Sequence, residues 1–416
     1  MTKHLYVPES FDPHILADKW SDYAAYVLSI INQRLVFEKL DPDAFAPLMS
    51  VLLKRVLPKR HYKIILDLLM RLDVIECDNR YSPGTKSKGY RLTARYRGEK
   101  HRRYLVTHPG LTAKLDQLKR EMHDGIILPV HRYLYRWLQE ITFEYPGDIR
   151  NFGRYFQQVD EIINKNFRFS TAYEGRVDTN LTNLKSELRT YLTFRGKELS
   201  TIDISNSQPL FLGVLCLNRL INNGFMQTAF QFKASKLHFA NTNLKAEEEG
   251  HSIMWEHTLG VPNNLQNYLK LCTAGKIYEH LMQRTGKDRQ MVKKAFFQVL
   301  FSSNRIERLI SLTPVLEQEF PTIMEAVRGM KQKDYKQASA LLTRTESDFV
   351  INRVCRRLMN DHPSTFVSTI HDCLMTTTED VPTVKAVILD EFERLCGLQP
   401  ALKIERLRPP GQVLAA

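Results

Sequence analysis

The stretch 197-KELSTIDISNSQPLFLGVLCLNRL-220 predicts a strand that stops at an acid and is followed by a helix. Apolar and polar residues alternate up to Asp203, and a long apolar run begins after Pro209. An acidic side chain at the tip of a core strand is costly unless a cation lies beside it. Asp203 is therefore a candidate cation ligand. The alternative is a helix N-cap role, because Asn206, Ser207 and Pro209 also resemble the start of a helix.

A second acid occupies a similar place near the C-terminal end. The stretch 363-PSTFVSTIHDCLMTTTEDVPTVKAVILDEFERLCGLQPALKIERL-407 predicts strand, tight turn, strand, helix and strand, with His371 and Asp372 at the turn. If this turn adjoins the end of the first strand, the carboxylates of Asp203 and Asp372 would repel unless divalent cations lie between them. Magnesium fits, because it is usually held by one or two carboxylates together with substrate phosphates.

A third segment, 288-DRQMVKKAFFQVLFSSNR-305, predicts a helix with Asp288 as its N-cap. Four of its residues recur every four positions and form a stripe that is cationic and then aromatic, namely Arg289, Lys293, Phe297 and Phe301. The helix N-terminus and the two cations could hold a triphosphate, and the rings could stack on a base and sugar. The alternative is an ordinary amphipathic helix with an aromatic core face.

The N-terminal region predicts helix, helix and hairpin. The helices are expected in 43-DAFAPLMSVLLKRVL-57 and after Pro58, and the hairpin in 74-VIECDNRYSPGTKSKGYRLTARYR-97, around a Pro-Gly turn. This is the order of a winged helix. Eight Lys or Arg lie between residues 86 and 103, so we expect contact with a DNA duplex through the hairpin, including Lys86, Lys88 and Arg91. The alternative is a solvated charged hairpin.

Two further regions are predicted to be helical. The first spans residues 110–169 and includes an amphipathic segment, 131-HRYLYRWLQEITFEY-145. The second runs from Pro209 to about Thr345.

Composition limits the class of protein. The chain has 416 residues, 43% of them hydrophobic, which is enough for two or three domains with cores. A formal net charge of +13 favours a polyanionic partner such as nucleic acid. The six cysteines show no metal-binding or disulfide pattern, and neither an apolar leader nor a membrane-spanning run is present. We therefore expect an intracellular, cytoplasmic protein without membrane partners.

These motifs resemble those of a known family. Asp203 in "DISNSQP", the Arg289 helix and the "HD" of "STIHDCLMTT" occur in the order of motifs A, B and C of family A DNA polymerases. Upstream, 174-EGRVDTNLTNLKSELRTYLTFRGKEL-199 is similar to that family's lead-in to motif A and puts Arg176 in the place of a minor-groove contact. The likeness covers roughly residues 169–410.

The resemblance implies roles for the residues that match. Asp203 and Asp372 would bind two magnesium ions, for which manganese could substitute, with the backbone carbonyl of Ile204 as a further ligand. Lys293 would act in catalysis by neutralising or protonating the leaving phosphate, and Arg289 would hold the γ-phosphate.

Other matching residues would bind the nucleotide and the primer-template. Phe297 would pack on the incoming nucleotide, Phe301 would lie near the template base, and His371 would touch the primer terminus.

Three positions depart from the family pattern. The glutamate that closes the pocket against a ribose hydroxyl is Gln208, its tyrosine partner is Phe301, and the acid after "HD" is Cys373. Gln208 is still bulky, but its hydrogen-bonded latch to a tyrosine cannot form. The choice between dNTPs and rNTPs therefore stays open.

The resemblance implies an α+β, right-hand polymerase fold, with an antiparallel palm sheet, helical fingers and thumb, and an N-terminal winged-helix-like domain. The expected division is 1–105 winged-helix-like DNA-binding domain, 106–168 helical linker or thumb, 169–208 first part of the palm, 209–345 helical fingers and 346–416 second part of the palm. The first 165 residues lack a three-acid exonuclease pattern, so proofreading is not expected.

The leading interpretation is a compact DNA-directed DNA polymerase of phage or mobile-element type that uses a DNA template, a primer and dNTPs. One alternative is a single-subunit RNA polymerase or primase of the same fold that uses rNTPs. The other is a non-enzymatic, DNA-binding replication initiator in which the winged helix binds DNA and the rest of the chain is a scaffold. If the gene belongs to a phage, the location is the host cytoplasm.

Overall fold

The computed structural model describes residues 3–82, 87–124, 126, 128–172, 175–222, 261–371 and 373–408. Lys86 and Asp372 lie outside the described residues, as does part of the predicted helical region. The chain forms two compact units. The N-terminal unit comprises Met1–Ser170, Asp178–Glu198 and Leu407–Ala416, and the C-terminal unit comprises Thr171–Val177 and Leu199–Arg406. The five domain boundaries expected from the sequence stay predictions.

The N-terminal unit is built around the long helix α1 (Asp18–Phe37), which packs on α3 (Tyr62–Arg71) and on the strand pair β1 (His4–Pro8) and β5 (His101–Leu105). A three-stranded antiparallel sheet follows, in the order β2 (Ala46–Pro47), β4 (Gly89–Leu92), β3 (Ile75–Cys77), with α2 (Ser50–Val56) between β2 and α3. Side chains from all these elements form one apolar core.

The predicted hairpin between residues 74 and 97 is confirmed, because β3 and β4 pair antiparallel with Ile75 opposite Leu92. The predicted helix 43–57 is wrong in its first half. Ala46 pairs with Tyr90, so this segment is an edge strand, and α2 begins only at Ser50. The local apolar pattern could not reveal this pairing, because the partner strand lies far along the chain.

The remaining elements of this unit are α4 (Pro109–Asp124), α5 (Pro129–Leu138), β6 (Ile141–Phe143), η2 (Ile149–Tyr155), α6 (Phe156–Ile163), α7 (Ser186–Arg189) and β9 (Leu192–Phe194). The single helix expected over 131–145 is wrong, because α5 ends at Leu138 and β6 pairs with β9. A short hairpin of β7 (Phe169–Thr171) and β8 (Val177–Thr179) follows α6.

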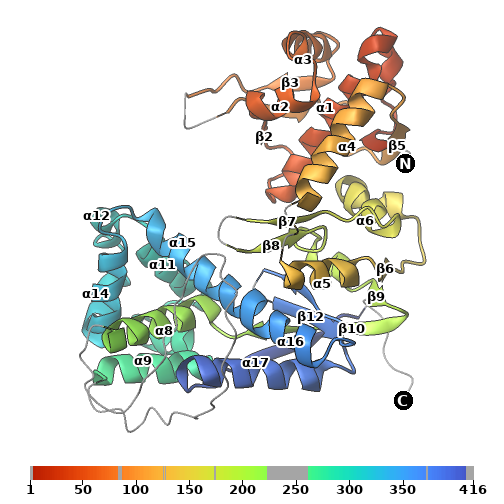
Figure 1. Ribbon diagram of the computed structural model, residues 1–416. Coiled ribbons are helices and arrows are strands. Elements are labelled where there is room, and N and C mark those ends of the chain that lie inside the picture. Colours follow the sequence, from red (N-terminus) through yellow and green to blue (C-terminus); the bar gives the residue numbers. More distant parts are fainter. Residues whose placement is uncertain are drawn as a thin grey trace. The chain divides into compact units, whose positions relative to one another are not determined.

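The C-terminal unit contains an antiparallel sheet in which β10 (Lys197–Ile204) lies between β12 (Cys373–Thr377) and β13 (Leu402–Arg406) from Leu199 onward. Strand β11 (Ser368–Ile370) pairs with β12, and α17 (Val381–Cys396) packs against β12 and runs along the strands (Figure 1). The predicted order of strand, turn, strand, helix and strand over 363–407 is confirmed.

Helices make up the rest of this unit. They are α8 (Ser207–Asn222), α9 (Asn263–Thr273), α10 (Ile277–Thr285), α11 (Arg289–Phe301), α12 (Asn304–Glu307), α13 (Thr313–Glu319), α14 (Pro321–Met330), α15 (Lys336–Ser347), the π-helix η4 (Asp348–Cys355) and α16 (Arg356–Asp361). The described parts of 209–345 are therefore helical, as predicted. Among the described residues, every helix is too short or too polar to span a bilayer.

Three buried rings fix the helix that follows β10. Phe211 of α8 lies 5.7 Å from Phe349 of the π-helix and 5.7 Å from Phe392 of α17, measured between ring centroids. Because each of these rings buries a large apolar area, the start of α8 is held firmly beside the sheet.

Candidate active site

Asp203 is half-buried and is the penultimate residue of β10, where its Cα is paired with that of Lys403 on β13. The next residue, Ile204, is 4% exposed and pairs with Leu402. Helix α8 begins at Ser207, so Asp203 belongs to the strand and does not occupy the position directly before the helix. The N-cap alternative therefore does not apply.

Two residues with left-handed backbone flank this end of the sheet. Asn206, after β10, has φ 56°, and His371, after β11, has φ 59°. Such conformations are uncommon for residues other than glycine and are concentrated at functional sites. Asn206 and His371 thus mark sharp turns directly after β10 and β11.

The second predicted acid, Asp372, lies outside the described residues, so the two carboxylates cannot be related by a distance. Its neighbour Cys373 begins β12, and Leu374 is paired with Ile202, the residue before Asp203. The strand register therefore brings the described chain next to Asp372 to the same end of the sheet as Asp203.

Helix α11 is capped as predicted, since the Asp288 carboxylate accepts a hydrogen bond from the Met291 amide at 2.9 Å. Its core face consists of Val292, Phe296, Val299 and Leu300. The predicted stripe lies elsewhere on the helix: Arg289 and Lys293 are exposed, and Phe297 and Phe301 are half-buried. Phe296 thus supplies the aromatic core face that the alternative interpretation predicted for this helix.

The stripe residues contact one another. The rings of Phe297 and Phe301 stack with centroids 5.7 Å apart and planes 18° apart, and the Lys293 ammonium lies 5.9 Å from the Phe297 centroid. Arg289 is 53% exposed and forms an ion pair of 3.2 Å with Glu279. The stripe therefore presents cations and a flat aromatic surface.

Lys403 lies opposite Asp203 in the register of β13 against β10. Its pKa is raised, chiefly by the hydrogen bond and charge of Glu405 and further by the charge of Asp203, whereas the charge of Arg289 lowers it. Lys403 is 64% exposed and ion-paired with Glu405, so the charges of Asp203 and Arg289 change its pKa only in addition to that pair. Sequence analysis missed Lys403, because only the register of β13 against β10 reveals it.

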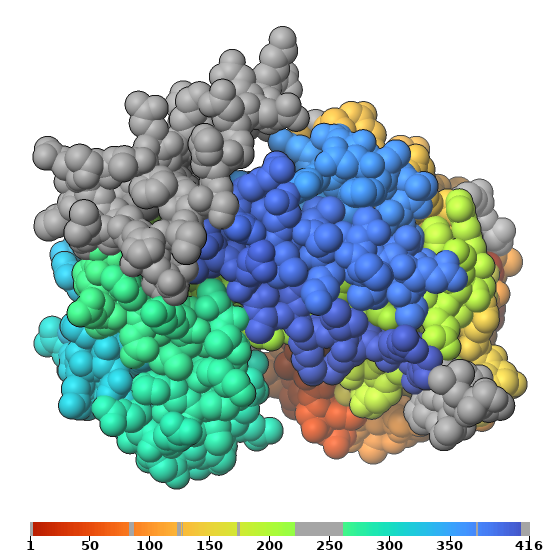
Figure 2. Space-filling model, turned by 90° about the horizontal axis from the view of Figure 1, so that it is seen from below, coloured from red at the N-terminus to blue at the C-terminus, as the bar shows by residue number. Residues whose placement is uncertain are grey.

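Other contacts support this end of the sheet. The Ser205 amide donates to the Ala401 carbonyl, and the Ala401 amide donates to the Thr273 carbonyl at the end of α9. In Figure 2 the dark blue residues that precede the grey C-terminal end accordingly adjoin the green helices on the face shown.

Arg176 and Gln208 converge on an acid that sequence analysis also missed. Nη2 of Arg176 and Nε2 of Gln208 each donate to Oε2 of Glu346 at 2.9 Å. Glu346 lies in the last turn of α15 and is 2% exposed. Its side chain thus joins two predicted site residues that are distant in the sequence.

Among the described residues, no group of three or more His, Cys, Asp or Glu side chains is placed to hold a metal ion. Asp203 is half-buried at the end of β10, and its side chain is of the type that magnesium sites use, whereas the second predicted carboxylate, Asp372, lies outside the described residues.

Basic residues of the N-terminal hairpin are largely engaged within the unit. Arg91 donates to Glu76 at 2.8 Å and to the Asp43 carbonyl at 2.7 Å, and its guanidinium lies 4.2 Å from the Phe45 ring centroid. Lys88 is exposed and contacts Asn79 at 3.3 Å. Fewer positive charges are therefore available to a binding partner than the number of basic residues in this segment suggests.

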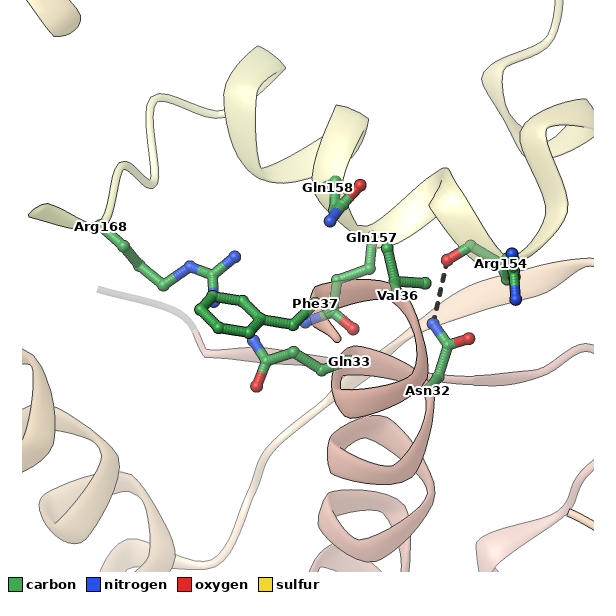
Figure 3. Close-up of a pocket in the computed structure, with 8 residues that line it drawn as sticks. All are labelled: Asn32, Gln33, Val36, Phe37, Arg154, Gln157, Gln158 and Arg168. Carbon is green, nitrogen blue, oxygen red and sulfur yellow. Dashed lines mark hydrogen bonds between the residues drawn. The ribbon is translucent and has the colours of Figure 1, made fainter. Parts of the chain in front are cut away.

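A polar pocket in the N-terminal unit lies between α1 and α6 (Figure 3). Its lining residues are Asn32, Gln33, Val36, Phe37, Arg154, Gln157, Gln158 and Arg168. A volume of about 10 Å³ matches a single water molecule and excludes a nucleotide.

Comparisons with known proteins give likenesses to solved structures only. The sequence matches no protein-family model and no curated protein. A solved structure that it resembles is the POL domain of Pol1 from M. smegmatis in complex with DNA primer-template and dNTP, with a TM-score of 0.29 and 13% identity. The match covers 70% of this chain and 65% of that one, so this chain spans less than two thirds of the polymerase domain. A likeness at this level fixes the role of no residue.

Proposed function

We propose that the chain is a template-directed nucleotidyltransferase, and specifically a DNA-directed DNA polymerase without a proofreading exonuclease. The observation that carries the proposal is that Asp203 lies at the end of β10 beside the start of β12, the strand that directly follows Asp372 in the sequence. We further propose that α11, whose stripe offers exposed cations followed by stacked rings, lies beside this strand end. This combination suits a metal-bound nucleoside triphosphate.

The proposed roles follow this arrangement. Asp203 and Asp372, with the carbonyl of Ile204, would hold two magnesium ions, which lower the pKa of the primer hydroxyl and stabilise the leaving pyrophosphate. Arg289 and Lys293 would hold the triphosphate from the N-terminal end of α11.

Further residues would complete the site. Phe297 and Phe301 would stack near the base, and His371 would contact the primer terminus. Arg176 would lie along the primer-template, positioned by Glu346.

The N-terminal unit is proposed to bind DNA as a winged helix. Support comes from the order α1, β2, α2, α3, β3, β4 and from the sheet order β2-β4-β3. In this topology α3 would enter the major groove and the β3–β4 hairpin, with Lys86 and Lys88, would contact the backbone.

Primer extension tests the proposal. Asp203→Asn and Asp372→Asn should each reduce incorporation by at least about a hundredfold while DNA binding persists. Asp361→Asn, at a 53% exposed acid of the same unit, is the matched control and should retain activity. Chelation of divalent ions should stop synthesis, and added magnesium should restore it.

The outcomes separate the alternatives. Extension with rNTPs instead of dNTPs would identify an RNA polymerase or primase. DNA binding with no nucleotide incorporation in the wild-type chain would refute the enzyme and favour the replication initiator.

A further inference from the structure

The N-terminal unit contains a largely apolar cavity lined by side chains of α1, α2 and α4. Ile30 of α1, Leu52 of α2 and Leu118 of α4 are among its lining residues. Its volume is about 130 Å³, whereas the polar pocket between α1 and α6 measures about 10 Å³. Well-packed interiors leave few voids larger than a water molecule, and an engineered apolar cavity of about 150 Å³ binds benzene. The three helices therefore leave room for a small guest molecule.

Polar contacts hold α2 and α4 together on both sides of the cavity. Nζ of Lys114 donates to the Val56 carbonyl at 2.6 Å, and Arg55 forms an ion pair with Glu121. Lys114, Leu118 and Glu121 are spaced four and three residues apart, so they share one face of α4. Leu118 thus lines the cavity between two contacts that fix the spacing of the helices. Closing the cavity by moving α4 towards α2 would disturb both contacts.

The polar groups in the lining are two arginines and a tyrosine. Arg34 and Arg55 line the cavity with 29% and 48% of their side chains exposed, and Tyr26 lies beside them. Burial raises the pKa of Tyr26 to about 12, and the positive charges of the two arginines oppose this rise, as expected from their place in the same lining. The cavity is therefore apolar inside and cationic on one side.

Both arginines can accept a further anion. Arg34 is ion-paired with Glu38, and Arg55 with Glu121, in pairs that are open to solvent and therefore weak. A guanidinium carries five N–H donors, so each arginine retains donors for a second carboxylate. The two glutamates show that the carboxylate is an anion that these guanidinium groups bind.

We propose that this cavity binds a small carboxylic acid whose apolar body is about the size of a benzene ring. The apolar body would lie against Leu52 and Leu118, and the carboxylate would bind Arg34 or Arg55. Apolar walls alone would accept any small hydrocarbon, whereas the two guanidinium groups favour an anion over an amine. The site belongs to the N-terminal unit and does not depend on the proposed polymerase function.

Three ligands of similar shape and different charge test the class of guest. Titrations of the full chain, followed by ligand-observed NMR, give the dissociation constants of cyclohexanecarboxylate, cyclohexylmethanol and cyclohexylmethylamine. The carboxylate should bind about tenfold more tightly than the alcohol, and the amine should bind most weakly. Equal affinities for the three ligands, or no binding of the carboxylate, would overturn the inference.

Substitutions of the arginines locate the site. Arg34→Gln and Arg55→Gln should each weaken the binding of cyclohexanecarboxylate by about fivefold and leave that of cyclohexylmethanol unchanged. Lys54→Gln is the matched control, because Lys54 is exposed on α2 next to Arg55 and its ammonium lies 5.3 Å from the centroid of the Tyr62 ring. This control should keep the wild-type affinities. Arginine variants that also keep them would overturn the inference.

Filling the cavity gives a second, independent test. Leu52→Trp should abolish the binding of both the carboxylate and the alcohol, with the thermal unfolding midpoint as the check that the variant is folded. A folded Leu52→Trp protein with wild-type affinities would place the ligand elsewhere and overturn the inference. The arginine variants alter partly exposed side chains, so their result stands even where Leu52→Trp does not fold. Failure of primer extension would refute the proposed function and leave this inference intact.

Discussion

Acidification should destabilise the N-terminal unit through His101. This residue begins β5 and is 4% exposed, and burial lowers its pKa from 6.5 to about 4, with the charge of Glu99 opposing the shift. Below pH 6.5 the unfolded chain takes up a proton that the folded chain does not, so the free energy of unfolding falls as the pH decreases. The interval from 6.5 to about 4 corresponds to a loss of about 2 kcal/mol at pH 5 and about 3 kcal/mol at pH 4. Above pH 7 the contribution should be constant.

Urea unfolding of the full chain and of His101→Gln, at several values between pH 8 and pH 4, measures this contribution. Other titrating groups are shared by both proteins, so they cancel in the difference between the two free energies of unfolding. The wild-type protein should lose its advantage over the variant progressively below pH 6.5. A difference that stays constant from pH 8 to pH 4 would refute the reasoning.

Two further substitutions test the support of α11. Glu307→Ala should lower the free energy of unfolding by about 3 kcal/mol in urea titrations, because it leaves the buried Lys331 without its carboxylate and leaves Arg328 with Glu317 alone. Glu325→Ala, at an exposed position of α14, should change this free energy little. Phe296→Ala should lower the free energy of unfolding by about 3–5 kcal/mol, since this ring is 1% exposed. Phe297→Ala, at a half-buried position, should raise the KM for nucleotide and lower the free energy of unfolding much less. Equal stability losses at positions 296 and 297 would contradict the assignment of the two faces.

Local patterns predicted the elements on which the proposed site depends. The alternation that ends at Asp203 and the segment around His371 became β10, β11 and β12, because each strand and its turn are encoded within a few residues. The errors at 43–57 and 131–145 have a common cause. Both segments contain short strands whose partners lie far along the chain, and such pairing overrides local helical periodicity.

The site residues likewise include some that local sequence patterns could predict and some that they could not. The stripe on α11 was predictable, because residues four apart share a helix face whatever the helix packs against. Lys403 and Glu346 could not be predicted. The position of Lys403 depends on the register of β13, and the position of Glu346 depends on the packing of α15 beside α8. No short motif marks either residue.

Lys403 affects how metal ions and nucleotide would bind at the proposed site. Lys403 is ion-paired with Glu405 and offsets the charge of Asp203 only in part, and this partial offset makes the site alone somewhat less attractive to divalent ions than two free acids would be. Arg289 and Lys293 add further positive charge on the side of α11. A triphosphate would bring negative charge to Lys293 and the metal ions, and it would compete with Glu279 for Arg289. Metal and nucleotide should therefore bind cooperatively, each raising the affinity for the other, because neither alone balances the charge of the side chains around Asp203.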